Sequence, residues 1–271
     1  VPSIVYDTLN DKVVISYAEN TSCYSVVGTV SGTSISFGTP VSFGANAFDG
    51  ANAGISSAFD SNSNKVVVTF KDSSNSNYVT IRVGTVSGTS ISFGSALHEY
   101  IPIDSETATV FDSTNNKIVV FFRNTSTSTG GCQVGTVSGT SISLGAQQTF
   151  VAATAYPQSM SALFDSDSGK TVTVYRAVAS NNNYGTAFVG TVSGTGISFG
   201  TSVVYESSDS TYNTLAYDST TGKVVIGFRA NTYGNAIVGT VSGTSISFGA
   251  KNVWHSADTN EISLAYNIPK S

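Results

Sequence analysis

The chain has 271 residues, a formal net charge of −5 and only 12 lysines and arginines. So few cations cannot neutralise a phosphate backbone, and no run of about 18 apolar residues is present, so we expect no nucleic-acid partner and no membrane insertion. The apolar fraction of 40% suffices for a core. The abundance of Ser, Thr, Asn, Gly, Val and Tyr favours strands and turns over helices.

Along the chain, the phrase VGTVSGTSISFG recurs five times. Two copies differ from it by one residue: Leu144 replaces Phe in the third copy, and Gly196 replaces Ser in the fourth. The copies begin at Val27, Val83, Val134, Val189 and Val238. A second phrase precedes each copy: an aromatic residue, Asp, a polar turn, Lys and an apolar run. Self-similarity at a spacing of roughly 50 residues indicates a repeat architecture.

Each repeat predicts four short strands. In the last repeat these are residues 213–217, residues 224–228, the VGTV segment and the SISFG segment with its continuation. Asp and short polar residues suit the first turn, and the Gly of Ser-Gly-Thr-Ser suits the reversal between the third and fourth strands. The recurring Asp and Lys are interpreted as scaffold, with Asp capping the turn and Lys closing the hairpin.

A four-stranded meander cannot bury both faces alone, so neighbouring repeats must stack. The sequence therefore predicts an all-β fold, a five-bladed β-propeller of four-stranded antiparallel blades, as one domain over residues 1–271. The predicted repeats cover residues 1–50, 51–103, 104–156, 157–208 and 209–260. A linear β-solenoid is the rival architecture. Residues 261–271 repeat the first strand and are expected to be surplus, or to pair with a second copy.

No catalytic residue, metal site or cofactor is predicted. The five glutamates are scattered, and the two histidines lie in the second and fifth repeats, without a metal-ligand cluster or a nucleophile motif. A basic residue follows the second strand in four repeats: Lys71, Arg123, Arg176 and Arg229. We interpret the arginines as pairing locally, with aspartates, with carbonyl groups or with an aromatic face. The alternative is a sialidase-like arginine clamp on a carboxylate.

The fourth strands end in residues that differ between repeats, and specificity is expected where a scaffold varies. The candidate ligand-binding residues are Trp254, His255, Tyr205, Glu206, His98 and Tyr100. Aromatic rings beside polar groups can stack on sugars, although packing between blades explains such rings equally well. Asn20 and Asn124 begin N-glycosylation sequons. Cys23 and Cys132 are predicted to be unpaired thiols.

The five copies of VGTVSGTSISFG resemble tandem repeats of uncharacterised secreted and phage structural proteins, and more distantly Kelch and Asp-box propellers. No S-x-D-x-G-x-T-W motif is present, so no catalytic residue carries over. Low charge, hydroxyl-rich loops and rigid repetition predict a non-enzymatic extracellular or virion-surface β-propeller for adhesion, glycan binding or structural assembly, with self-assembly through terminal strand exchange. The expected partners are a glycan or cell-surface ligand, and a second copy through residues 261–271. The alternative is a sialidase-like or lyase-like carbohydrate-active enzyme.

Overall fold

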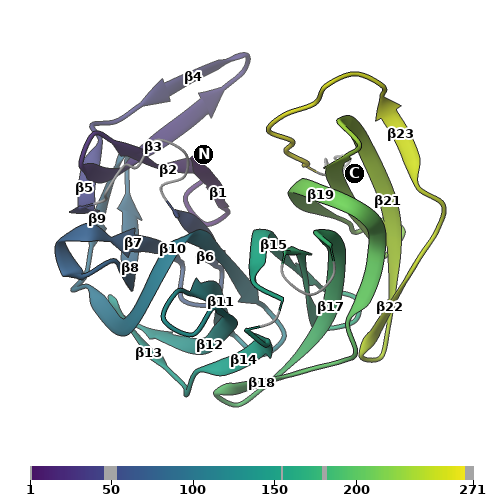
Figure 1. Ribbon diagram of the computed structural model, residues 1–271. Helices are drawn as coiled ribbons and strands as arrows, with labels where there is room; N and C mark the ends of the chain where they lie inside the picture. The colour runs from purple at the N-terminus through teal and green to yellow at the C-terminus, as the bar shows by residue number, and fades with distance from the viewer. Residues whose placement is uncertain (1, 46–53, 154, 179–181, 266–271) are drawn as a thin grey trace. The chain divides into compact units, whose positions relative to one another are not determined.

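The computed structural model describes residues 2–45, 54–153, 155–178 and 182–265 (Figure 1). The chain forms two compact units, residues 1–127 with 132–147 and residues 128–131 with 148–271. The described residues form strands and a single-turn 3₁₀ helix, η1 (Ser73–Asn75), with no α-helix among them. The expected all-β class is confirmed. The expectation of one domain stays a prediction.

The described strands form three antiparallel sheets. The first contains β1 (Ser3–Asp7), β2 (Lys12–Glu19), β3 (Ser22–Ser31), β4 (Ser34–Phe37) and β5 (Val41–Ala45). The second contains β6 (Ser56–Asp60), β7 (Lys65–Asp72), β8 (Tyr78–Ser87), β9 (Ser90–Phe93), β10 (Leu97–Asp112), β11 (Lys117–Asn124), β12 (Thr129–Ser138), β13 (Ser141–Leu144) and β14 (Gln148–Val151). The third contains β15 (Pro157–Asp165), β16 (Lys170–Ala177), β17 (Tyr184–Ser193), β18 (Gly196–Phe199), β19 (Val203–Asp218), β20 (Lys223–Ala230), β21 (Tyr233–Ser242), β22 (Ser245–Phe248) and β23 (Asn252–His255).

The strand order within each repeat follows the prediction, but the fourth strand is broken into two. In the first repeat, β4 pairs with the second half of β3 and β5 pairs with its first half. The break follows Gly38, whose N–H donates to the Val27 carbonyl at 2.9 Å. One long third strand therefore carries two short partners along the same edge.

The number of separate sheets also differs from the prediction. The 16-residue strands β10 and β19 each continue from the end of one repeat into the first strand of the next. They pair with β8 and β11, and with β17 and β20, respectively. Because each joins two repeats into one sheet, the described strands form three sheets rather than five four-stranded ones. The three sheets are open paths of strands, and a count of five blades is not confirmed.

The recurring aspartate caps the first turn of each repeat, as predicted. At Asp60, one carboxylate oxygen accepts the N–H groups of Asn62 and Ser63 at 2.9 and 3.0 Å, and the other accepts the Ser63 hydroxyl at 2.7 Å. Asp60 also lies opposite Lys65 in the strand register. The residue before each Lys has a positive φ that Asp, Asn and Gly tolerate best: Asp11, Asn64, Asn116, Gly169 and Gly222.

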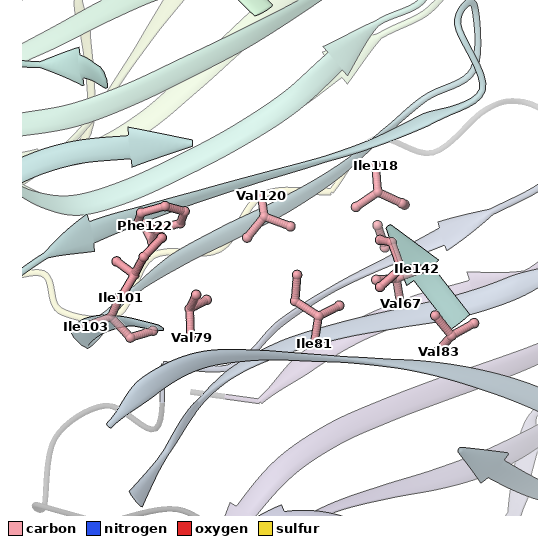
Figure 2. Close-up of a cluster of buried hydrophobic side chains, with 11 residues drawn as sticks. Val67, Val79, Ile81, Val83, Ile101, Ile103, Ile118, Val120, Phe122 and Ile142 are labelled. Carbon is pink, nitrogen blue, oxygen red and sulfur yellow. The ribbon is translucent and has the colours of Figure 1, made fainter. Parts of the chain in front are cut away.

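The second strand of an inner repeat is buried on both faces. In β7, Val66 and Val68 belong to a cluster with side chains of the first sheet, whereas Val67 belongs to a cluster with Val120 of β11. Figure 2 shows this second cluster, in which branched side chains of β7 and β8 face those of β11. Side chains on successive positions of a strand point to opposite faces, so an unbroken apolar run suits this sandwiched place.

Both cysteines are buried, and neither forms a disulfide within the described residues, as predicted. Burial raises the pKa of Cys132 to about 12, so this thiol stays protonated at neutral pH. No helix of the described residues is long and apolar enough to cross a membrane.

Candidate functional site

Three arginines, each the last residue but one of a second strand, are paired with aspartates. Arg123 contacts Asp104, Arg176 contacts Asp209 at 2.7 Å, and Arg229 contacts Asp258 at 2.8 Å. Asp209 and Asp258 lie after the fourth strand of the same repeat as their arginine, whereas Asp104 lies in β10, after the fourth strand of the repeat before that of Arg123. The interpretation that these arginines pair with local aspartates is therefore confirmed.

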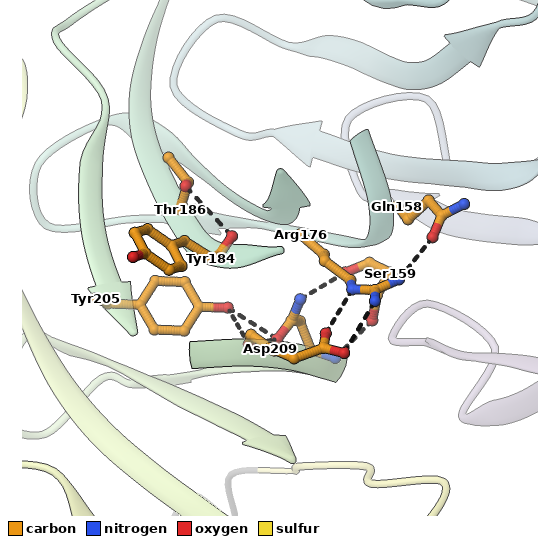
Figure 3. Close-up of polar contacts among 9 residues, drawn as sticks. Gln158, Ser159, Arg176, Tyr184, Thr186, Tyr205 and Asp209 are labelled. Carbon is orange, nitrogen blue, oxygen red and sulfur yellow. Dashed lines mark hydrogen bonds and ion pairs between the residues drawn. The ribbon is translucent and has the colours of Figure 1, made fainter. Parts of the chain in front are cut away.

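The Arg176 side chain makes the richest set of these contacts. Its Nε and Nη2 donate to the two carboxylate oxygens of Asp209 at 2.7 and 3.0 Å, and its Nη1 donates to Gln158 Oε1 at 2.9 Å (Figure 3). These bonds use three of the five N–H donors of a guanidinium. The Asp209 side chain is 54% exposed, so an ionised carboxylate is presented to solvent in a fixed orientation.

Two irregular strands surround this pair. The pairing of β15 with β16 shifts between Gln158 and Ser161, and the pairing of β19 with β20 shifts between Thr211 and Thr214. Ser159 and Tyr212 at these shifts have φ values of 47° and 53°. Bulges and left-handed backbone in residues other than glycine cost free energy and concentrate at functional sites.

Asn213 links the two irregular strands. Its backbone N–H donates to the Ser159 hydroxyl at 2.9 Å, and its side-chain amide donates to the Ser159 carbonyl at 3.1 Å. Its side-chain oxygen accepts the hydroxyls of Tyr205 and Ser210 at 2.8 and 2.7 Å. We call Gln158, Ser159, Arg176, Asp209 and Asn213 the Arg176 cluster, and Figure 3 labels the first four of these residues.

Two of the predicted ligand-binding residues, Tyr205 and Glu206, are buried beside this cluster. Burial raises the pKa of Tyr205, so its hydroxyl remains a donor to Asn213. Glu206 accepts the Lys251 ammonium at 2.6 Å and the Ser208 hydroxyl at 2.6 Å. Burial alone would raise the pKa of Glu206, but the bonds from Lys251 and Ser208 outweigh it, and the net pKa is lowered. Both residues belong to β19, and their side chains bond to Asn213 and Lys251, respectively.

The other four predicted ligand-binding residues are more exposed. His98 Nδ1 lies 2.9 Å from the Thr80 hydroxyl, and the ring of Tyr100 is highly exposed. Trp254 stacks on His255, with ring centroids 5.8 Å apart. Trp254 also lines a cavity of about 430 Å³, together with Ala236 and residues 259–264. The two sequon asparagines differ: Asn20 is exposed, whereas Asn124 is buried and accepts the Ser126 N–H and hydroxyl.

Sequence reasoning found Arg176 but missed Gln158, Ser159, Asp209 and Asn213. None of these four occupies a position that recurs with the same residue type in every repeat, so periodicity does not reveal them. The one indication in the sequence was that the segment after each fourth strand varies between repeats, and Asp209 lies in such a segment. Across the described ranges, no group of three or more His, Cys, Asp or Glu residues is placed to hold a metal ion.

No protein-family model and no curated protein matches this sequence. Among solved structures, a mutant of the NanB sialidase from Streptococcus pneumoniae is similar, with a TM-score of 0.52, 18% identity, and coverage of 77% of this chain and 32% of the sialidase. An exo-beta-1,3-galactanase from Phanerochaete chrysosporium has a TM-score of 0.46 and 9% identity, with coverage of 74% and 50%. A protein from Lactobacillus plantarum has a TM-score of 0.49 and 12% identity, with coverage of 94% and 85%.

The likeness to the sialidase supports a propeller-type fold, although the chain spans about a third of the sialidase's length. It does not confirm the particular repeat type. The expectation of a non-enzymatic adhesin is contradicted, because this similar structure, with a TM-score of 0.52, is a sialidase. At 18% identity the shared feature is the fold.

Proposed function

We propose that this protein is a carbohydrate-active enzyme of the sialidase-like kind, with the Arg176 cluster as its substrate site. The observation that carries the proposal is the exposed carboxylate of Asp209, held by two bonds from Arg176 beside two bulged strands. The fold likeness to a sialidase supports the substrate class, and the fixed guanidinium supports a carboxylate-bearing sugar.

The chemistry follows from competition for one guanidinium. A carboxylate on the sugar replaces Asp209 at Arg176, because both anions need the same pair of N–H donors. Gln158 keeps its bond to Nη1 and holds the guanidinium in place during this exchange. The released Asp209 then lies beside the bound sugar, where a carboxyl group can serve as a general acid or base at the glycosidic oxygen.

Turnover of fluorogenic glycosides tests this proposal. We expect hydrolysis of a glycoside that carries a carboxylate, and a loss of roughly 100-fold or more in kcat/KM in Arg176→Ala, because a two-bond carboxylate contact and the placement of Asp209 are both removed. Arg176→Lys should recover little activity, since an ammonium cannot reproduce the planar fork.

Arg229→Ala is the matched control. Arg229 occupies in the last repeat the position that Arg176 occupies in the fourth, and it also pairs with an exposed aspartate, Asp258. Its loss therefore removes an equivalent ion pair outside the Arg176 cluster. This variant should keep its activity. Absence of turnover on every glycoside, or equal losses in Arg176→Ala and Arg229→Ala, would contradict the proposed site.

An extracellular or virion-surface location stays a prediction. So does a sugar-contacting role for His98 and Tyr100. The Tyr100 and Tyr78 rings form a T-shaped contact with centroids 5.6 Å apart, and Tyr100 remains exposed enough to stack on a sugar.

A further inference from the structure

Neighbouring first strands are joined by a hydrogen bond that recurs in both units. In the first unit, the Thr107 hydroxyl donates to the Gly54 carbonyl at 3.0 Å. In the second unit, the Asn213 amide donates to the Ser159 carbonyl at 3.1 Å. Thr107 and Asn213 both stand five residues before the recurring aspartate of their repeat, and Gly54 and Ser159 both stand six residues before theirs. A hydroxyl is therefore enough to make this scaffold bond.

Asn213 also makes bonds on its other side, because the donor nitrogen and the acceptor oxygen of an amide are separate atoms. A carbonyl oxygen only accepts, so the amide nitrogen of Asn213 faces the Ser159 carbonyl and the amide oxygen points the other way. That oxygen accepts the hydroxyls of Tyr205 and Ser210 at 2.8 and 2.7 Å. Asn213 is 7% exposed, so water is poorly placed to replace a lost partner.

The bonds of this amide end beside the two groups that hold Arg176. Ser159 follows Gln158 in β15, and Ser210 follows Asp209 in β19. Figure 3 shows Gln158 and Asp209 approaching the Arg176 guanidinium from different sides, and they bind different nitrogens of it. The amide therefore connects the two halves of the grip on Arg176.

Regular strand pairing does not fix this connection. The register of β15 with β16 shifts between Gln158 and Ser161, and the register of β19 with β20 shifts between Thr211 and Thr214. The linking amide belongs to a residue inside the second shift, and the carbonyl that it binds belongs to a residue inside the first. The spacing between the two halves of the grip therefore depends on side-chain bonds rather than on a backbone ladder.

We propose that Asn213 is a positioning residue of the Arg176 cluster, a role that rests on the proposed function. Its amide nitrogen anchors the strand that carries Gln158, and its amide oxygen anchors the segment that carries Asp209. Because Asn213 is buried, it acts on the sugar through these two residues rather than by contact.

The two sides of the amide predict different kinetic effects. The nitrogen side keeps Gln158 on the guanidinium that binds the carboxylate of the sugar, so this side governs KM. The oxygen side keeps Asp209 beside the glycosidic oxygen, so this side governs kcat. Loss of the oxygen side alone should lower kcat and leave KM nearly unchanged, whereas a general loosening of the fold would not separate the two constants.

Asn213→Thr makes this separation. The threonine hydroxyl can restore the scaffold bond to Ser159, but it leaves the Ser210 and Tyr205 hydroxyls without their acceptor. We expect kcat on a fluorogenic glycoside that carries a carboxylate to fall at least about 10-fold, with KM within about 2-fold of the wild type. Ser210→Ala removes one of the bonds to the same oxygen and should lower kcat in the same direction by a smaller factor.

Thr107→Val is the matched control. This variant removes the equivalent bond to Gly54 in the first unit, outside the Arg176 cluster. It should weaken the scaffold as Asn213→Thr does, but it should leave both kcat and KM unchanged.

Exchange of the Arg176 Nε–H with water, followed by NMR, is a readout that needs no turnover. This proton is bonded to Asp209, so its exchange rate reports whether the carboxylate stays aligned with the guanidinium. The proton should exchange at least about 10-fold faster in Asn213→Thr than in the wild type or in Thr107→Val.

The outcomes separate this inference from the proposed function. Unchanged exchange in Asn213→Thr, a rise in KM without a fall in kcat, or an equal loss of kcat in Thr107→Val would overturn the positioning role. No turnover by the wild type, together with faster exchange in Asn213→Thr, would contradict the proposed function and still support the positioning role. If Asn213→Thr does not fold, Ser210→Ala decides the question by the same two measurements.

Discussion

At the residue scale, Glu206 shows how a buried charge is held in a protein with few charges. Its carboxylate is buried on β19, where the Lys251 ammonium and the Ser208 N–H and hydroxyl all donate to it. These bonds keep its pKa below the ordinary 4.5 despite burial. A lowered pKa in the folded state means that the ionised form contributes stability.

The contribution of Glu206 is therefore expected to depend on pH. It is present above the ordinary pKa of 4.5 and is lost as the pH falls through the lower folded value. Glu206→Gln should lower the free energy of unfolding by about 1 kcal/mol at neutral pH, since Lys251 is partly exposed and its attraction is screened. Urea unfolding of both proteins at neutral pH and well below pH 4.5 measures this. A gap between them that stays constant with pH would contradict the assignment.

At the scale of elements, the contact between repeats depends on a missing side chain. The glycine that ends each SISFG phrase lies where the fourth strand breaks, and in Gly94 it touches the carbonyl of Thr140 from the next repeat. Backbone atoms cannot move aside as a flexible side chain can. The requirement for glycine there comes from close approach between repeats rather than from a turn.

Alanine at two equivalent glycines separates these causes. Gly94→Ala should lower the free energy of unfolding by about 1–3 kcal/mol, because its Cβ overlaps the Thr140 carbonyl. Gly249→Ala, at the same place in the last repeat, should change it by less than about 0.5 kcal/mol, because the nearest atom to its Cβ position, the Val238 carbonyl oxygen, is 3.8 Å away. Thermal or urea unfolding at low protein concentration measures both. Equal losses would indicate that glycine is needed for the strand break.

At the scale of the whole molecule, apolar side chains are exposed on the first sheet, as in Ile35 and Phe37, and on the last repeat, as in Val238 and Trp254. With a net charge of −5 and few charged residues, contacts of these side chains should depend on apolar burial rather than on ion pairs.

Sedimentation of the wild-type protein tests this expectation. The average mass should change little between low and high salt, because screening acts on charges and leaves apolar burial intact. A lower mass at high salt would instead indicate ion pairing.

The repeated elements were predictable because their determinants are local. The Asp of each first turn accepts hydrogen bonds from the N–H groups of the residues two and three positions later. The Gly that follows Ser in each later turn supplies a positive φ. The broken fourth strand and the long β10 and β19 were not predictable, because they depend on which strand lies alongside. The candidate site was half predictable: Arg176 stands at a recurring position, whereas Gln158 and Asp209 reach it from separate strands through irregular backbone.

The sequence by itself determined an all-β chain of five repeats, since alternating apolar residues and turn chemistry act over a few residues at a time. Only the tertiary structure decided how strands join into sheets, which exposed carboxylate meets Arg176, and which copies of the same phrase are covered. Ile35 and Ile246 belong to identical phrases, yet one is exposed and the other buried. Burial depends on a neighbouring repeat, and no residue carries that information within its own phrase.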